Sequence, residues 1–208
     1  MQSIQKIDEK PRMSEKEIIL FENTLMGCDN FLEYGCGSST KFALSFGISR
    51  IFSVDSSRSW IENLSSDKRI HANIIKGRLH FIYIDIGPTG DWGYPTDKSR
   101  QESWIEYSRQ PWLQLRRLGV CPDVVLVDGR FRVACFLRSL IAYLDAGQAE
   151  SMKILLHDVR DDRPAYRIPF EFCDILEQAD SLVLLRPKIN INKMKVLEFY
   201  QQFLLVPG

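Results

Sequence analysis

The stretch between Phe31 and Asp55 constrains the fold of this 208-residue chain more than any other. It reads Phe-Leu-Glu-Tyr-Gly-Cys-Gly-Ser-Ser-Thr from Phe31 and Ile-Phe-Ser-Val-Asp from Ile51. An apolar strand runs into a turn with glycines at Gly35 and Gly37, a helix opens with small hydroxyl residues, and a second apolar strand ends in an acid. This order predicts a βαβ unit that binds a nucleotide-like ligand.

Each part of this unit has a physical role in holding a ligand. The glycines allow a tight turn and let a ligand approach the backbone closely. The helix start at Ser38 or the next residue leaves backbone N–H groups without intrahelical partners. Asp55, at the end of the second strand, can accept hydrogen bonds from ribose hydroxyls. The unit therefore predicts a ribose-containing ligand at the carboxyl ends of the strands.

The turn departs from the dinucleotide-binding fingerprint at two positions. The fingerprint G-x-G-x-x-G/A has a third small residue where this chain has Thr40. Glu33 lies two residues before the first glycine, and its carboxylate is an unfavourable neighbour for a pyrophosphate. A carboxylate at this place suits a cationic ligand instead. An NAD(P)-dependent oxidoreductase on a Rossmann sheet stays an alternative, with Glu33 and Thr40 against it.

The turn Glu33-x-Gly35-x-Gly37, followed by Asp55 on the second strand, resembles the first motifs of the class I S-adenosylmethionine-dependent methyltransferases. The resemblance covers nearly all of the chain after Asp29. It implies a single α/β domain over residues 1–208, with a three-layer Rossmann-like sheet of about seven strands, mostly parallel with a C-terminal antiparallel hairpin. It also implies S-adenosylmethionine, which carries an ammonium and a sulfonium but no phosphate, as the cofactor of a methyl transfer.

Strand and helix patterns alternate along the rest of the chain. Ser14 as N-cap with Glu17 three residues later predicts a capping box that opens a first helix over residues 14–26. Residues 1–28 are thus predicted as an N-terminal helical extension. Further strands are predicted over 31–34, 50–55, 79–84, 123–127, 153–156, 181–185 and 195–199, and helices over 38–46, 57–64, 103–118, 132–144 and 170–178. The last two strands are expected to form the antiparallel hairpin.

A turn-rich stretch over residues 87–101 interrupts this alternation after the third strand. It holds Trp92, Tyr94 and two prolines. Loops of this length without regular structure are uncommon and often functional. We predict a lid whose aromatic side chains cover the ligand pocket; a surface loop pinned by one buried tryptophan is the alternative.

In an open α/β sheet, ligands bind beyond the carboxyl ends of the strands. The resemblance implies that residues around the first three strand ends hold the cofactor, and it places Asp85 opposite the adenine amino group. The predicted cofactor-binding residues are Glu33, Gly35, Cys36, Gly37, Ser38, Asp55, Ser56 and Asp85. For the acids among them, stabilisation of a helix N-terminus is the structural alternative.

The ends of the fourth and fifth strands supply the predicted catalytic residues Asp128, His157 and Asp158. By resemblance, the loop after the fourth strand borders the methyl group and the acceptor. His157 follows the fifth strand, where a histidine could remove a proton from a hydroxyl or amine nucleophile. A lone histidine is, however, more often a hydrogen-bonded structural residue. We expect both Asp128 and His157 to be solvent-accessible in one pocket.

Asp128 and Asp158 are also similar to the acids with which metal-dependent O-methyltransferases hold magnesium. Those enzymes add a neighbouring asparagine, where this chain has Val159. Two carboxylates could still hold a magnesium ion that keeps several waters. Because the third ligand is absent, we assign no metal ligand, and magnesium stays possible but not favoured.

Two arginines flank a phenylalanine directly after Asp128, in the run Arg130-Phe131-Arg132. Arginine forks suit carboxylate or phosphate groups of a substrate. A solvated helix start explains the same residues equally well, and the sequence leaves both interpretations open.

The overall charge favours a small molecule over a nucleic acid as the acceptor, which we expect to present an oxygen or nitrogen nucleophile. The chain has 27 basic and 27 acidic residues, so it lacks the basic surplus of a general nucleic-acid binder. Its five cysteines show no C-x-x-C spacing, which argues against a zinc site or a disulfide framework. Neither a signal peptide nor an apolar run of membrane-spanning length is present, so we predict a cytoplasmic protein without a membrane partner. A methyltransferase-like binding protein without activity is a further alternative.

Overall fold

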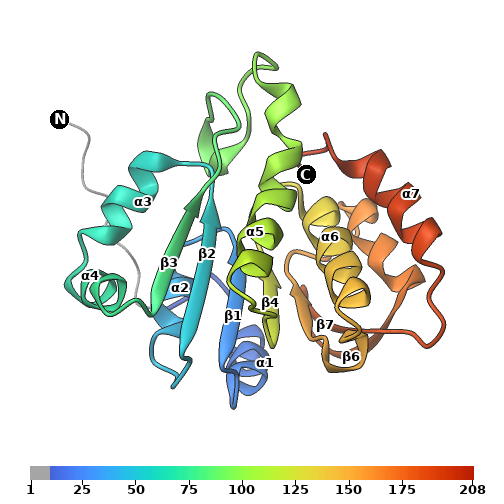
Figure 1. The fold of residues 1–208 in the computed structure, drawn as a ribbon, viewed down its shortest axis with the longest axis horizontal. Helices are drawn as coiled ribbons and strands as arrows, with labels where there is room; N and C mark the ends of the chain where they lie inside the picture. Colours follow the sequence, from blue (N-terminus) through green and yellow to red (C-terminus); the bar gives the residue numbers. More distant parts are fainter. Residues whose placement is uncertain (1–9) are drawn as a thin grey trace.

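The structure is a computed structural model that describes residues 10–208. Within this range the strands form one seven-stranded sheet with the order β3-β2-β1-β4-β5-β7-β6 (Figure 1). Strands β1 to β5 run parallel, whereas β7 runs antiparallel to both β5 and β6, so the predicted α/β fold with a C-terminal antiparallel hairpin is confirmed. The partner of β7 in this hairpin is β6, not the predicted strand over 195–199. The strand bounds are β1 Asn30–Tyr34, β2 Arg50–Asp55, β3 Leu79–Tyr83, β4 Val124–Val127, β5 Ile154–Leu156, β6 Cys173–Ala179 and β7 Leu182–Pro187.

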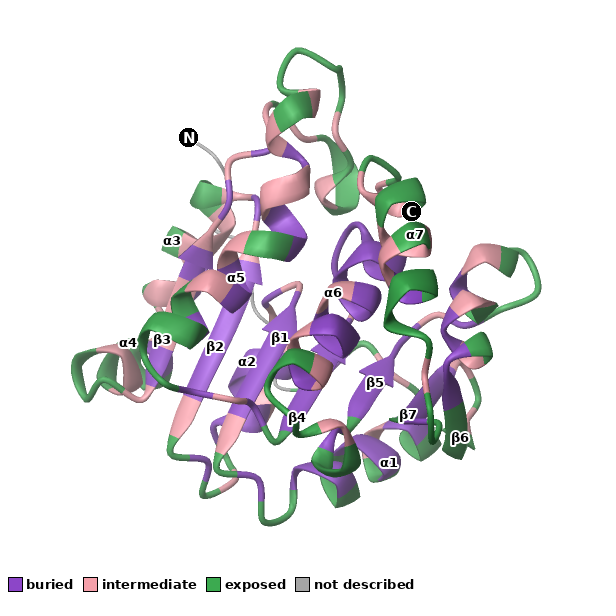
Figure 2. Ribbon diagram, turned by 45° about the vertical axis from the view of Figure 1, so that its right-hand side comes forward, coloured by how far each residue is buried: buried purple, intermediate pink, exposed green. Residues whose placement is uncertain are grey.

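Helices cover both faces of the sheet because its central strands are apolar on both sides. Helices α5, α6 and α7 lie over one face, and α1 and α2 lie behind the other (Figure 1). Strands β1, β2 and β5 are mostly buried, as Figure 2 shows in purple. The helix bounds are α1 Glu15–Leu25, α2 Ser38–Ala43, α3 Arg58–Ser65, α4 Lys68–Ile75, α5 Ile105–Arg117, α6 Arg132–Asp145 and α7 Lys193–Phe203.

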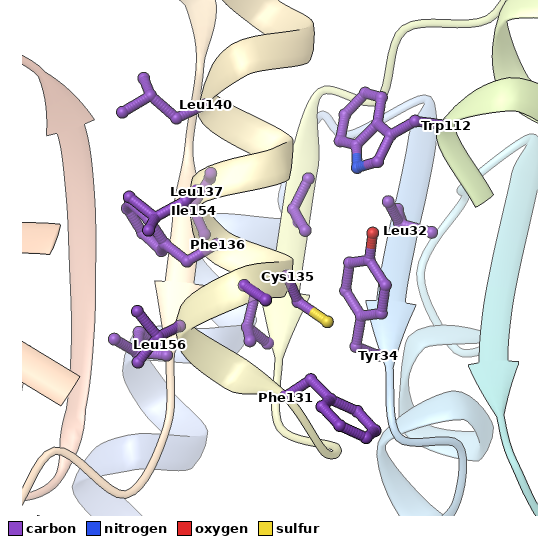
Figure 3. Close-up of a cluster of buried hydrophobic side chains, with 14 of the residues drawn as sticks. Leu32, Tyr34, Trp112, Phe131, Cys135, Phe136, Leu137, Leu140, Ile154 and Leu156 are labelled. Atoms are coloured by element: carbon purple, nitrogen blue, oxygen red, sulfur yellow. The ribbon is translucent and has the colours of Figure 1, made fainter. Parts of the chain in front are cut away.

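Alternating residues of each strand enter two separate apolar clusters. In β1, Leu32 and Tyr34 join the cluster under α5 and α6, whereas Phe31 joins the cluster under α1 and α2. Figure 3 shows the first cluster, in which Phe136 and Leu137 of α6 lie beside strand residues of β5. Burial of this kind contributes roughly 25 cal/mol per Å² of apolar surface, so the two clusters hold the strand ends in register.

The N-terminal helix is bound to the far edge of the sheet through one buried acid. Glu17 closes the predicted capping box, because its Oε2 accepts a hydrogen bond from the Ser14 amide at 2.7 Å. Its Oε1 accepts two more, from the Ser181 amide at 2.9 Å and the Ser181 hydroxyl at 2.6 Å. Helix α1 is therefore tied to the β6–β7 turn. Residues 1–9 of the predicted 1–28 extension lie outside the described residues.

Two predictions near the C-terminus are wrong. The segment predicted as a helix over 170–178 forms the end of a 3-10 helix over Pro164–Glu171 and then the edge strand β6. Most of β6 is exposed, so it lacks the apolar alternation that identifies a half-buried strand. The segment predicted as a strand over 195–199 lies inside α7, which Asn192 caps by accepting from the amides of Met194 and Lys195.

A further helix, α4, lies between the second and third strands where the sequence predicted none. Its start is fixed by Asp67, whose side chain accepts hydrogen bonds from the amides of Arg69 and Ile70. The described part of the chain contains no helix that combines the length and the apolar character needed to cross a lipid bilayer.

The bonds of Glu17 predict a large loss of stability on its removal. In Glu17→Ala, a buried cap and the acceptor for Ser181 disappear together, and we expect a loss of about 2–4 kcal/mol in the free energy of unfolding. Glu15→Ala is the matched control, because Glu15 is an exposed acid in the same helical turn, and it should cost less than about 1 kcal/mol. Urea denaturation measures both; equal losses would show that the Ser181 anchor contributes nothing.

Candidate functional site

The predicted glycine turn is held from below by another main chain. Gly35 has a φ of +91°, and a Cβ atom there would lie 2.8 Å from both Cα and N of Gly129. The turn after β1 therefore touches the turn after β4, and a side chain at either place would separate them. Gly35 is required by the fold itself, both for its positive φ and for this contact.

Neither the backbone conformation nor the packing requires a glycine at position 37. Its φ of 170° is extended backbone that any residue adopts. The nearest described atom to a Cβ at Gly37 is Cζ2 of Trp60, at 4.0 Å, so space lies over the main chain here. Trp60 supports the same turn by donating its indole N–H to the Cys36 carbonyl at 2.8 Å. A ligand that approaches the main chain closely would explain why glycine stands at this position.

Asp55 connects the end of β2 to the glycine turn. Its Oδ2 accepts hydrogen bonds from the Cys36 amide at 3.2 Å and from the Cys36 thiol at 3.4 Å. Its Oδ1 accepts from the Ser57 amide at 2.8 Å. Burial raises the pKa of the Asp55 carboxyl, while the bonds from Ser57 and Cys36 act in the opposite direction. The side chain keeps partial exposure, so it can still accept a bond from a ligand.

Glu33 lies beneath the turn and is fully buried. Its Oε2 accepts from the Ser39 hydroxyl at 2.7 Å, and its Oε1 accepts from the hydroxyls of Thr40 and of Ser53, the latter at 2.5 Å. Burial raises the pKa of Glu33 to about 7, while the three hydroxyl bonds act to lower it. These bonds fix the start of α2 against β2, and direct contact between Glu33 and a cofactor stays a prediction.

The sequence contained a recognisable indication of this role for Glu33. Ser53 is its direct neighbour across the parallel β1–β2 pair, and Ser39 and Thr40 open the following helix. Hydroxyl residues at these three places mark an acid that is satisfied internally, because a buried carboxylate needs several donors. The interpretation of Glu33 as a ligand for an ammonium group did not consider them.

Asp85 anchors the predicted lid. Its Oδ1 accepts from the Gly87 amide at 3.0 Å, and its Oδ2 pairs with the Arg100 guanidinium. The carboxylate thus joins both ends of the segment over residues 87–101, and the predicted contact with adenine stays a prediction.

The loop between these ends reaches back over the sheet. A Cβ atom at Gly93 would lie 3.7 Å from the Ser56 hydroxyl and 3.8 Å from Cγ of Arg130, which follow β2 and β4. Tyr94 stacks on Arg130, whose guanidinium carbon lies 4.1 Å from the ring centre. Trp92 is instead 72% exposed, so the alternative of a loop pinned by one buried tryptophan at Trp92 is wrong.

His157 is buried between two carboxylates. Its Nδ1 lies 2.8 Å from Asp128 Oδ1, and its Nε2 lies 3.5 Å from Glu17 Oε1. Burial acts to lower the pKa of His157, but the hydrogen bond and charge of Asp128 outweigh it, with help from Asp158, and the pKa is raised. The residue is 7% exposed, so the expectation that His157 is solvent-accessible is wrong.

Arg132 links the two acids that end β4 and β5. Its guanidinium lies 3.1 Å from Asp128 Oδ1 and 2.8 Å from Asp158 Oδ2, and the residue is 3% exposed. It also donates to the carbonyl oxygens of Gly129 at 2.9 Å and His157 at 2.7 Å. Arg163 pairs with Asp158 as well, at 2.7 Å, and these arginines lower the pKa of Asp158 although burial opposes them.

Asp128, His157 and Asp158 are the residues of this site that could be considered as metal ligands. Ligand atoms of Asp128, His157 and Asp158 lie within 4.8 Å of one another, a spacing that could hold a metal ion. However, both carboxylates already bind the Arg132 guanidinium. A buried cation of the protein itself balances their charge, so these residues do not fit a magnesium site.

Comparison with solved structures finds proteins of similar fold. The methyltransferase-like protein spo2022 from Silicibacter pomeroyi shares 27% sequence identity and a TM-score of 0.73, covering 96% of this chain and 100% of the other. The chain is a member of the Rossmann-like methyltransferase superfamily. The Escherichia coli protein yhhF has the same fold, with a TM-score of 0.51 and 14% identity over 88% of this chain and 93% of its own. No protein-family model and no curated protein matches the chain.

The methyltransferase fold brings some of the predicted residues together and separates others. One surface region at the carboxyl ends of β1, β2 and β4 collects Gly35, Cys36, Gly37, Asp55 and Ser56, with Ser38 opening α2 beside them. Asp128 adjoins this region through Gly129. Glu33 lies beneath it, Asp85 lies at the base of the loop, and His157 and Asp158 are engaged by neighbouring charged groups.

The raised pKa of Glu33 predicts how stability depends on pH. A carboxyl that titrates near pH 4.5 when unfolded and near 7 when folded makes the folded state bind more protons between these values. Its contribution is fully present below pH 4.5 and is lost as pH rises through 7, at about 1.4 kcal/mol per pH unit crossed. In Glu33→Gln this dependence should vanish, so the difference in unfolding free energy between the two proteins should change between pH 5 and 8. A difference independent of pH would contradict the assignment.

Proposed function

We propose that the chain transfers a methyl group from S-adenosylmethionine to a small-molecule acceptor with an oxygen or nitrogen nucleophile. The observation that carries the proposal is the turn at Gly35 and Gly37. Gly129 contacts this turn at Gly35, and the space over Gly37 is open although the fold does not require glycine at that position. The similarity over its full length to spo2022, a methyltransferase-like protein, supports methyl transfer as the reaction class.

The residues around the turn fit the parts of this cofactor. Asp55 would accept bonds from the ribose hydroxyls, because this residue stands partly exposed at the end of β2. The open main chain at Gly37 and the start of α2 at Ser38 would face the remainder of the molecule. The cofactor supplies a methyl group that the positive sulfur already activates, so the protein contributes mainly proximity and orientation.

Asp128 is the residue best placed to accept a proton from the acceptor. Its side chain is 27% exposed, and one oxygen is held by His157 and Arg132. General-base help from such a carboxylate is needed only when the nucleophile carries a proton. His157 and Asp158 would act through Asp128 and Arg132 as positioning residues, because neighbouring groups engage them both.

Three alternatives remain separable by experiment. An oxidoreductase would bind NAD rather than S-adenosylhomocysteine, and an inactive binding protein would bind the latter without turnover on any acceptor. A nucleic-acid acceptor is disfavoured by the balance of 27 basic and 27 acidic residues. Turnover assays with metabolite pools and with total RNA as separate acceptors would distinguish the two substrate classes.

Titration calorimetry with S-adenosylhomocysteine tests the cofactor site. Gly37→Ala should weaken binding at least tenfold and leave thermal stability nearly unchanged, because a methyl group there meets open space in the protein but blocks a ligand. Asp55→Asn keeps an oxygen for the Ser57 amide and should also weaken binding about tenfold, since charged acceptors contribute roughly 1.5–3 kcal/mol.

Gly35→Ala is the contrasting variant for this experiment. It should lower the melting temperature clearly, because the new side chain collides with Gly129 and the φ is positive. Preferential binding of NAD, or full affinity for S-adenosylhomocysteine in Gly37→Ala, would contradict the proposed cofactor site.

A further inference from the structure

Arg130 is a buried cation whose hydrogen-bonding atoms the described residues do not fully satisfy. It follows Asp128 and Gly129 in the turn after β4 and is 8% exposed. Within residues 10–208, its Nε and NH1 atoms have no hydrogen-bond partner. Burying a charged group without partners costs folding free energy, so this side chain is retained at a cost to stability. Buried polar groups without a hydrogen-bond partner are rare in folded proteins, and each calls for an explanation such as a bound ligand.

Arg132 shows what a structural arginine looks like in the same turn. Its guanidinium contacts the carboxylates of Asp128 and Asp158 and three carbonyl oxygens. The sequence suggested that both arginines could bind a substrate anion. The structure distinguishes the two arginines, because the Arg132 guanidinium is bound by carboxylates and carbonyl oxygens whereas two nitrogen atoms of Arg130 have no hydrogen-bond partner among the described residues.

Polar groups with donor hydrogens converge beside Arg130. A Cβ atom at Gly208 would lie 2.9 Å from Tyr166 Oη, 3.5 Å from Tyr94 Oη and 3.6 Å from Arg130 NH1. Tyr166 is 3% exposed, and its hydroxyl also lacks a partner in the described part of the chain. All three groups carry donor hydrogens and lie around the Cα atom of Gly208, and groups of this kind are the ones with which proteins bind an oxyanion.

The segment over residues 207–208 lies against these groups. The Phe131 amide donates to the Pro207 carbonyl at 2.9 Å, and the Tyr94 hydroxyl donates to the Gly208 carbonyl over a long 3.4 Å. Arg130 Nε and NH1 still find no acceptor there. A ligand oxyanion would therefore gain bonds that this segment does not supply.

We propose that Arg130, with the hydroxyls of Tyr94 and Tyr166, forms a subsite that binds a carboxylate or phosphate group of the methyl acceptor. The acceptor part of this inference rests on the proposed function. The subsite adjoins the cofactor turn, because Gly129 contacts Gly35, and the loop over residues 87–101 closes it where Tyr94 stacks on the guanidinium. A planar arginine fork matches the geometry of either anion.

The test follows the arginine Nε–H signals of the ¹⁵N-labelled protein by NMR. Inorganic phosphate and acetate are titrated separately, so that the two anion sources are distinguished, and acetamide serves as the uncharged match for acetate. The variants are Arg130→Gln, Arg130→Lys and, as control, Arg160→Lys, an exposed arginine of the loop after β5 that pairs with Asp162.

At least one anion should saturate and shift the Arg130 signal, whereas acetamide should not. Arg130→Gln should weaken that anion's binding at least tenfold, Arg130→Lys by a smaller factor because it keeps the charge but loses the fork, and Arg160→Lys not at all. The melting temperature of Arg130→Gln should stay the same or rise, because an unpaired buried charge is removed.

Unshifted Arg130 signals with both anions would overturn the proposal. So would a lowered melting temperature of Arg130→Gln together with unchanged anion binding, which would make Arg130 a packing residue for Tyr94. Binding of S-adenosylhomocysteine is measured on the same samples. If the anion binds but S-adenosylhomocysteine does not, the proposed function is refuted and the anion subsite stands. If S-adenosylhomocysteine binds but neither anion does, the subsite alone is refuted.

Discussion

The contact between Gly35 and Gly129 is the constraint on which the site depends. Two main chains touch where neighbouring parallel strands end, and hydrogen bonds from the Gly35 amide to the Val54 carbonyl and from the Asp128 amide to the Tyr34 carbonyl extend the contact to β2. The turn after β1 is thereby fixed relative to the acid at the end of β4. A rigid scaffold of this kind positions reacting groups without help from the ligand.

Charge at the carboxyl edge of the sheet is balanced by the protein's own groups. Asp128 and Asp158 share Arg132, and His157 faces both Asp128 and Glu17. Removing any one member would leave a buried charge without its partner, which costs more than the pair itself contributes. Two of the three predicted catalytic residues thus belong to a network that orients the third.

Residues near one another in sequence were predicted well, and residues joined only by the fold were not. The βαβ unit, the capping box at Ser14 and the bounds of β2 follow from local pattern, and the structure has them as predicted. The edge strand β6 and helix α7 were misassigned, because β6 is mostly exposed and Val196 is the one buried residue of α7, so neither shows a clear apolar periodicity. The partners of Glu33 left a pattern in the sequence, because Ser39 and Thr40 follow it closely and Ser53 faces it across the β1–β2 pair. The neighbours of Arg130 and His157 come from distant segments, so no spacing in the sequence could reveal which of these two charges was satisfied.

The attachment of α1 has a consequence for the order of the site. Glu17 binds the β6–β7 turn and also faces the ring of His157, which in turn holds Asp128. The packing of α1 on the sheet and the orientation of the Asp128 carboxylate are therefore energetically coupled, so that a change in one shifts the equilibrium of the other. Partial unfolding that begins at the N-terminal helix would release the imidazole before the sheet itself opens.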